Sequence, residues 1–139
     1  MIAVVDGLVK LKEFKIHDKG RLSTLNFSIG TSEYRFVSVY APSEKETEGS
    51  ISYFKKLFQT EIIDPERQNI VAGYWNCGVY SKDYHNYVDW INYRPKTRQI
   101  IKNGSLEHGL VDPYVISNPR YAVRSQNIQG TPTVEENRT

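Results

Sequence analysis

Polar and aromatic residues follow a short apolar run in the middle of the chain. Residues 70–72 (Ile-Val-Ala) are followed directly by Gly73, Tyr74, Trp75 and Asn76. The run is too short for a helix and predicts a central strand that is buried on both faces. Gly73 allows the backbone to turn or to approach a neighbour closely. We therefore expect the strand to deliver polar side chains to a site at its C-terminal end.

Basic residues cluster near the start of a second predicted helix. Arg94 and Arg98, together with Lys96 and Lys102, are spaced so that they could track a phosphate backbone, or form an ordinary solvated helix face. A metal role is not indicated for His108, which has no second ligand at a recognisable spacing.

The elements that position these residues can be predicted from periodicity. Strands are expected near residues 9–16, 22–29 and 34–40, the last with Tyr34, Phe36, Ser38 and Tyr40 on one face and Arg35, Val37 and Val39 on the other. Apolar residues at three- and four-residue spacings predict a helix over residues 48–63, followed at once by the strand at 70–72. Pro95 begins a second helix, with Ile100, Ile101 and Leu106 on its inner face, and Gly109 ends it before an extended segment at 110–114.

This order of elements predicts an α/β fold with a mixed β-sheet and packing helices. A strand, a crossover helix and a second strand in sequence build neighbouring strands of a partly parallel sheet. We expect one domain over residues 1–123 and a flexible C-terminal tail over 124–139. The residues expected in the core are Phe36, Val39, Phe54, Leu57, Phe58, Ile70, Val71 and Leu110.

Composition indicates a globular protein, and the number of cysteines bears on the redox state of its compartment. Hydrophobic residues make up 39% and charged residues 24% of the 139 residues, which is unlike a disordered chain. The formal charge of +2 does not argue for nucleic acid. Cys77 is the single cysteine, which excludes an internal disulfide and fits a reducing, intracellular compartment. The sequence contains no apolar run that approaches a membrane span, so no membrane partner is expected.

Four short motifs follow one another along the chain: Asp18-Lys19-Gly20-Arg21-Leu22, Val39-Tyr40-Ala41-Pro42, Gly73-Tyr74-Trp75-Asn76, and Leu110-Val111-Asp112 with Asn118-Pro119-Arg120-Tyr121. In this order they resemble motifs of the endonuclease/exonuclease/phosphatase superfamily, in particular the apurinic-endonuclease-like domain of LINE-type retrotransposons. The first is similar to the family's Asp-x-x-Gly-Arg entry to a strand, and the second to its Val-Tyr-Ala-Pro. Gly73-Tyr74-Trp75-Asn76, with Asp83 downstream, is similar to Gly-Asp-Phe/Trp-Asn and its following aspartate. Leu110-Val111-Asp112 with Asn118-Pro119-Arg120-Tyr121 resembles the last pair of motifs.

The resemblance implies a fold and a set of roles. It implies part of a four-layer α/β sandwich whose ancestral reaction was Mg²⁺-dependent phosphodiester hydrolysis on DNA. Tyr40 would lie beside the scissile phosphate, unless it only packs at the sheet rim. Asn76 would orient a phosphate oxygen, unless it caps a turn through its own side chain. Asp83 would support the loop and its site, unless it is an ordinary solvated loop carboxylate.

The departures from the family pattern are as informative as the matches. Tyr74 occupies the position of the motif aspartate, and tyrosine is neutral at pH 7, so it cannot serve as the general base. The metal-holding Glu and the Asp-His pair of the family have no visible equivalent, so we expect no Mg²⁺ to bind. We expect an inactive endonuclease fragment. The alternatives are a degenerate binding module that associates through an exposed sheet edge, or a phosphatase of the same superfamily.

Overall fold

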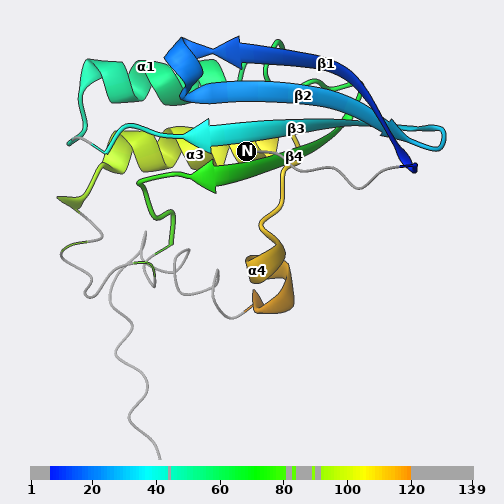
Figure 1. Cartoon of the computed structure of the whole chain (residues 1–139). Coiled ribbons are helices and arrows are strands. Elements are labelled where there is room, and N and C mark those ends of the chain that lie inside the picture. Colours follow the sequence, from blue (N-terminus) through cyan, green and yellow to red (C-terminus); the bar gives the residue numbers. More distant parts are fainter. Residues whose placement is uncertain (1–6, 44, 81–82, 84–88, 90–91, 120–139) are drawn as a thin grey trace, which may run out of the picture.

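The chain forms a four-stranded mixed β-sheet with helices, in a computed structural model that describes residues 7–43, 45–80, 83, 89 and 92–119 (Figure 1). The strands, in spatial order, are β1 (Val9–His17), β2 (Leu22–Ile29), β3 (Ser32–Tyr40) and β4 (Gln68–Tyr74). β1, β2 and β3 are antiparallel neighbours, and β4 runs parallel to β3. The predicted α/β class with a mixed sheet is therefore confirmed at this coarse level.

A β-bulge explains why the first strand lacks a clean alternation in sequence. Leu11 pairs with Phe27 and Glu13 with Asn26, so Lys12 is the extra residue on β1. The insertion brings Leu11 and Phe14, three residues apart, onto the same face of the sheet. The short 3₁₀ turn η1 (Asp18–Gly20), in which Asp18 and Lys19 have positive φ, then leads into β2.

Two helices are anchored at their N-termini by side chains. Helix α1 (Glu48–Leu57) begins with a capping box in which Thr47 and Ser50 exchange backbone and side-chain hydrogen bonds. Helix α3 (Pro95–Glu107) carries Pro95 in its first turn, as predicted, and its Thr97 N–H donates to Glu46 Oε1 at 2.6 Å. Helix α4 (Pro113–Ser117) is one turn long and is capped by Asp112.

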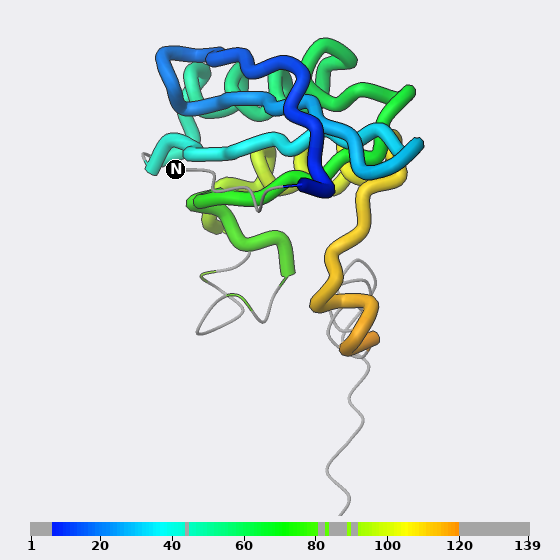
Figure 2. Tube along the Cα trace, turned by 45° about the vertical axis from the view of Figure 1, so that its right-hand side comes forward, coloured from blue at the N-terminus to red at the C-terminus, as the bar shows by residue number. Residues whose placement is uncertain are grey.

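Helices α1 and α3 cover one side of the sheet. Figures 1 and 2 both show them behind the strands, with α4 below the β4 edge. The core between the sheet and these helices consists of Leu22, Val37, Val39, Ala41, Tyr53, Phe54, Leu57, Ile62, Ile63 and Ile101. None of the described helices is long and apolar enough to cross a membrane.

A buried polar network supports the far end of the same face. Arg35 donates from Nε to Asn26 Oδ1 at 2.7 Å and from Nη1 to the Glu61 carbonyl at 2.9 Å. Arg35 also lies 3.6 Å from Asp64, whose pKa is lowered chiefly because its carboxylate accepts the Glu66 N–H. The predicted grouping of Arg35 with Val37 and Val39 on one face of β3 is confirmed, since all three are buried.

The core prediction was correct for some residues and wrong for Ile70. Val39, Phe54 and Leu57 are buried, whereas Phe36, Phe58, Val71 and Leu110 are half-buried. Ile70 is 45% exposed, because β4 ends the sheet and is not the central strand that the apolar run predicted.

Three further expectations need correction. Helix α1 ends at Leu57 and not at residue 63, although Ile62 and Ile63 beyond it are still buried. Leu106 is 83% exposed and does not belong to the inner face of α3. The expected extended segment at 110–114 contains the start of α4, because Asp112 and Pro113 form a helix start. The expected tail at 124–139, like Arg120 and Tyr121 of the last motif, lies outside the described residues.

Candidate functional site

Two tyrosines meet at the C-terminal ends of the parallel strands. Tyr40 and Tyr74 are directly paired in the β3–β4 register, and their rings stack with centroids 6.2 Å apart and an interplanar angle of 28°. Both are open to solvent, at 58% and 62% exposure. The structure therefore brings these two predicted site residues together, on an accessible rim of the sheet.

Gly73 makes this pairing possible. Its φ is +142°, and a Cβ at this position would lie 1.9 Å from the Val39 carbonyl oxygen. Only glycine lets the β4 backbone come this close to β3. The ladder then continues past the strand ends, where the Ala41 N–H donates to the Tyr74 carbonyl at 2.8 Å.

Asn76 lies just beyond β4 with its amide directed into the protein. Its backbone is in the left-handed region, with φ of 51°, which Asn tolerates better than most residues. The Nδ2 atom donates to the Ala41 carbonyl at 2.7 Å. The side chain therefore joins the loops that follow β3 and β4. This role is structural, and it differs from the local turn cap that the sequence suggested as the alternative to phosphate binding.

Arg94 holds the same two loops from the other side. It is 2% exposed, and its Nη1 donates to the Pro42 carbonyl at 3.1 Å and to the Asn76 carbonyl at 2.9 Å. Its guanidinium lies 5.8 Å from the centre of the Phe54 ring, a cation–π distance. Arg94 is the residue directly before α3, and its backbone is in the left-handed region, with φ of 47°. Arg94 thus clamps the chain where β3, β4 and α3 meet.

The basic cluster is not one solvated face. Arg98 is 9% exposed and Arg94 is buried, whereas Lys96 is open to solvent at the start of α3. Burial, followed by the charge of Arg98, lowers the pKa of Lys102. A solvated face is therefore wrong for the two arginines, which are buried, and Arg94 is turned toward Phe54 of α1 and the loops after β3 and β4. Phosphate binding by Arg94 and Arg98 stays a prediction.

Asp83 closes a turn in the loop after β4. Its Oδ2 accepts the Tyr80 N–H at 2.8 Å. Burial, together with the carboxylates of Asp112 and Asp83, raises the pKa of Tyr80. Asp83, which was expected to support the loop, therefore lies near Tyr80, while the rest of that loop between 81 and 91 is mostly outside the described residues.

The donor set at the sheet end does not fit a Mg²⁺ ion. Mg²⁺ is usually held by one or two carboxylates in octahedral geometry. Here the two paired residues are phenols and the nearby amide of Asn76 is bonded to Ala41. No group of three His, Cys, Asp or Glu side chains suited to a metal occurs in the described part of the chain. What the rim does offer is two stacked phenols, which can donate hydrogen bonds and stack on planar groups.

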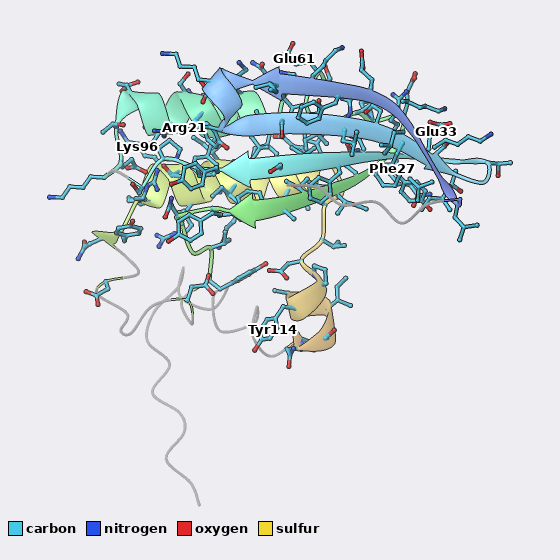
Figure 3. The ribbon with its side chains drawn as sticks, viewed as in Figure 1. Arg21, Phe27, Glu33, Glu61, Lys96 and Tyr114 are labelled. Carbon is cyan, nitrogen blue, oxygen red and sulfur yellow. The ribbon has the colours of Figure 1, made fainter. Side chains whose placement is uncertain are left out.

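Two cationic residues lie at the same end of the sheet as this rim. In Figure 3, Arg21 and Lys96 lie at the sheet end that carries the C-terminal ends of β3 and β4, while Phe27 and Glu33 lie at the opposite end. The Arg21 carbonyl accepts the Tyr40 N–H at 2.8 Å, which fixes Arg21 next to the site.

Sequence reasoning missed two residues that build the site. Arg94 was considered for phosphate contact and not as an internal clamp, and Glu46 was not considered although it caps α3 across 51 positions of sequence. Long-range contacts of this kind leave no periodic signal. The only available hint was that Arg94 directly precedes Pro95, where a helix start needs satisfied N–H groups.

Comparison with known proteins assigns no relationship. No family model matches the chain, and no curated protein gives a significant match.

Proposed function

We propose that the chain is a non-catalytic relative of metal-dependent phosphodiesterases. It resembles part of an endonuclease domain of retrotransposon type in which Tyr74 has replaced the aspartate that the reaction needs. The observation that carries the proposal is the convergence of Tyr40, Tyr74 and Asn76 at the C-terminal ends of two adjacent parallel strands. These are the positions that the motif resemblance assigns to phosphate and water in the active family. A sheet with both described long helices on the same side is compatible with part of an α/β sandwich.

Loss of catalysis follows from the chemistry of the side chains. Hydrolysis of a phosphodiester needs a base for the attacking water and charge to stabilise the phosphoryl oxygens. Tyr74 carries a phenol where the motif has a carboxylate, and one amide donor of Asn76 already bonds the Ala41 carbonyl. Groups that act together in catalysis are strongly non-additive, so the loss of one removes most of the rate.

A nicking assay tests the proposal. Supercoiled plasmid and an abasic duplex are incubated with the chain and Mg²⁺ or Mn²⁺, and we expect no cleavage above a no-protein control. Tyr74→Asp alone is expected not to restore cleavage. Tyr40→Phe serves as the matched variant, because an exposed ring can lose its hydroxyl without disturbing the fold. Metal-dependent cleavage that Tyr40→Phe and Asn76→Ala both reduce would refute the inactive assignment.

Affinity for DNA without cleavage is a separate question within the same proposal. Arg21 and Lys96 lie at the same end of the sheet as the tyrosine rim and would supply positive charge there. Binding through phosphates would weaken steeply with salt, in proportion to the number of contacts. The same assay mixtures, measured by fluorescence anisotropy at several salt concentrations, separate retained binding from retained chemistry. A phosphatase of the same superfamily would instead release inorganic phosphate from a phosphomonoester.

A second candidate is a binding module that takes an extended segment along β4. Within the described sheet β4 pairs only with β3. Its sequence, from Gln68 to Tyr74, contains no charged residue and no proline, which are the usual protections of an edge strand. Addition of a strand to such an edge supplies backbone hydrogen bonds to the partner. Slower amide exchange in residues 68–74 on addition of a partner would support this candidate, and unchanged exchange would oppose it.

A further inference from the structure

The side of the sheet opposite α1 and α3 is apolar across all four strands. We call it the open face, and its positions follow from the pairing registers. Phe14, Leu25, Phe36 and Ile70 form one cross-strand row, and Leu11, Phe27 and Tyr34 lie in the next. Phe27 and Tyr34 stack at 5.3 Å. Within the four described strands, none of the positions on this face is charged. They are Val9, Leu11, Phe14, Ile16, Ser23, Leu25, Phe27, Ile29, Ser32, Tyr34, Phe36, Ser38, Tyr40, Gln68, Ile70, Ala72 and Tyr74.

This face is exposed to a degree unusual for a sheet side. Phe14 is 55% exposed, Leu11 58% and Ile16 66%. Ile29, Tyr40, Ile70 and Tyr74 on the other strands are also exposed, whereas Phe27, Tyr34 and Phe36 are half-buried and Leu25 is buried between its neighbours. Contiguous apolar patches of this extent mark interaction surfaces. The other side of β1 carries Lys10, Glu13, Lys15 and His17, of which the first three are exposed. Both sides of β1 are therefore open to solvent, and the apolar residues are on the side away from the helices.

We propose that the open face is the interface of a homodimer, in which two copies of this chain pack their sheets face to face. The area matches such an interface. Seven large apolar side chains on the face are roughly half exposed, and at roughly 200 Å² each they expose about 800 Å², which is the area that each partner buries in a standard interface. Two sheets that pack in this way interdigitate side chains across a layer of about 10 Å.

A second copy suits the face because the face carries no charge. A two-fold interface sets each patch against its own image, so any charged residue near the axis faces a like charge. The four strands present only apolar and neutral polar side chains there, and an identical surface meets them without repulsion. The interface would extend to Tyr40 and Tyr74, so association would cover part of the tyrosine rim. The proposal does not depend on the function proposed above.

The test is the oligomeric state of the full chain by sedimentation equilibrium over a range of concentrations. We expect a monomer–dimer equilibrium for the wild type. Phe14→Glu and, separately, Phe14→Lys should each raise the Kd at least roughly 30-fold, because each would bury an unpaired charge against an apolar surface. Leu106→Glu is the matched control, because Leu106 is an 83% exposed apolar residue on α3, away from the face, and should leave the Kd unchanged.

The outcomes distinguish dimerisation through the open face from dimerisation through another surface of the chain. Phe14 lies on β1, at the side of the sheet away from β4, so dimerisation through the β4 edge would survive Phe14→Glu and would overturn the proposal. The proposal is also overturned if the wild type stays monomeric up to roughly 0.1 mM, which is well above the Kd of interfaces of this size. In that case the open face would be covered by another protein or by residues outside the described part of the chain. Circular dichroism of each variant shows whether it has folded.

Discussion

Substitution of Gly73 by alanine should nearly abolish the stability of the fold. The alanine Cβ would lie 1.9 Å from the Val39 carbonyl oxygen and 2.8 Å from the Val39 nitrogen and carbonyl carbon. All three contacts are with backbone, so no side chain can rotate away. The φ of +142° adds a conformational cost of about 1–3 kcal/mol for a residue with a Cβ. Relief requires β4 to separate from β3, which also releases the Ala41–Tyr74 hydrogen bond.

We therefore expect Gly73→Ala to cost at least about 4 kcal/mol, a large part of the 5–15 kcal/mol that keeps a typical domain folded. The measurement is urea unfolding followed by circular dichroism. Gly49→Ala is the control with the opposite sign, because Gly49 has only Thr47 Oγ1 within 4 Å, at 3.7 Å. In the exposed first turn of α1 that change should stabilise by about 0.5–1 kcal/mol. A Gly73→Ala protein within about 1 kcal/mol of wild type would refute the close approach of β3 and β4.

Two further predictions concern the helix side of the sheet. Gly104→Ala should destabilise the fold by about 1–3 kcal/mol, because the alanine Cβ would lie 2.3–2.5 Å from the Phe58 ring, and this clash outweighs the helix preference of alanine of about 1 kcal/mol. Urea unfolding of Gly104→Ala and of the double variant with Phe58→Leu tests this. The smaller leucine should recover part of the lost stability. His17 has its pKa lowered from 6.5 by burial and by the nearby Lys56, so the folded state resists protonation and the unfolded state takes up the proton first. The stability that neutral His17 contributes to the folded state is complete above pH 6.5 and is lost as the pH falls through 6.5 toward the folded pKa. The Tm of the wild type should therefore drop on acidification through this window, and the Tm of His17→Gln should drop less. Equal slopes of Tm against pH for the two proteins would contradict the assignment.

Local pattern was sufficient for most of the fold. The strands at 9–16, 22–29 and 34–40 and the helix after Pro95 were predicted close to their observed bounds, because alternation, turn residues and a helix-starting proline act over a few residues. The two faces of β3 were also predicted correctly. The β-bulge at Lys12 blurred the pattern of β1 in sequence without changing its state.

The errors share one cause, which is that burial depends on neighbours far away in sequence. Ile70 lies in an apolar run typical of a central strand, yet no strand follows on the outer side of β4 within the described sheet, so Ile70 is 45% exposed. Arg94 and Arg98 look like surface cations but are buried, and Arg94 contacts α1 and two loops that are distant in sequence. At the candidate site, the pairing of Tyr40 with Tyr74 followed from the parallel strands, whereas the bonds of Asn76 to Ala41 and Arg94 could not be predicted.

The mixed topology of the sheet has a consequence for the order in which the chain assembles. β1, β2 and β3 pair across short turns, so their contacts form at little cost in loop entropy. β4 can pair with β3 only after the chain between residues 41 and 67, including α1, has closed as a loop. We expect the three-stranded meander to form first and β4 to dock last, an order that pulse-labelled amide exchange would detect. Until docking, β3 is an unpaired edge, so the slow closure of this crossover is the step of folding most exposed to misassociation between chains.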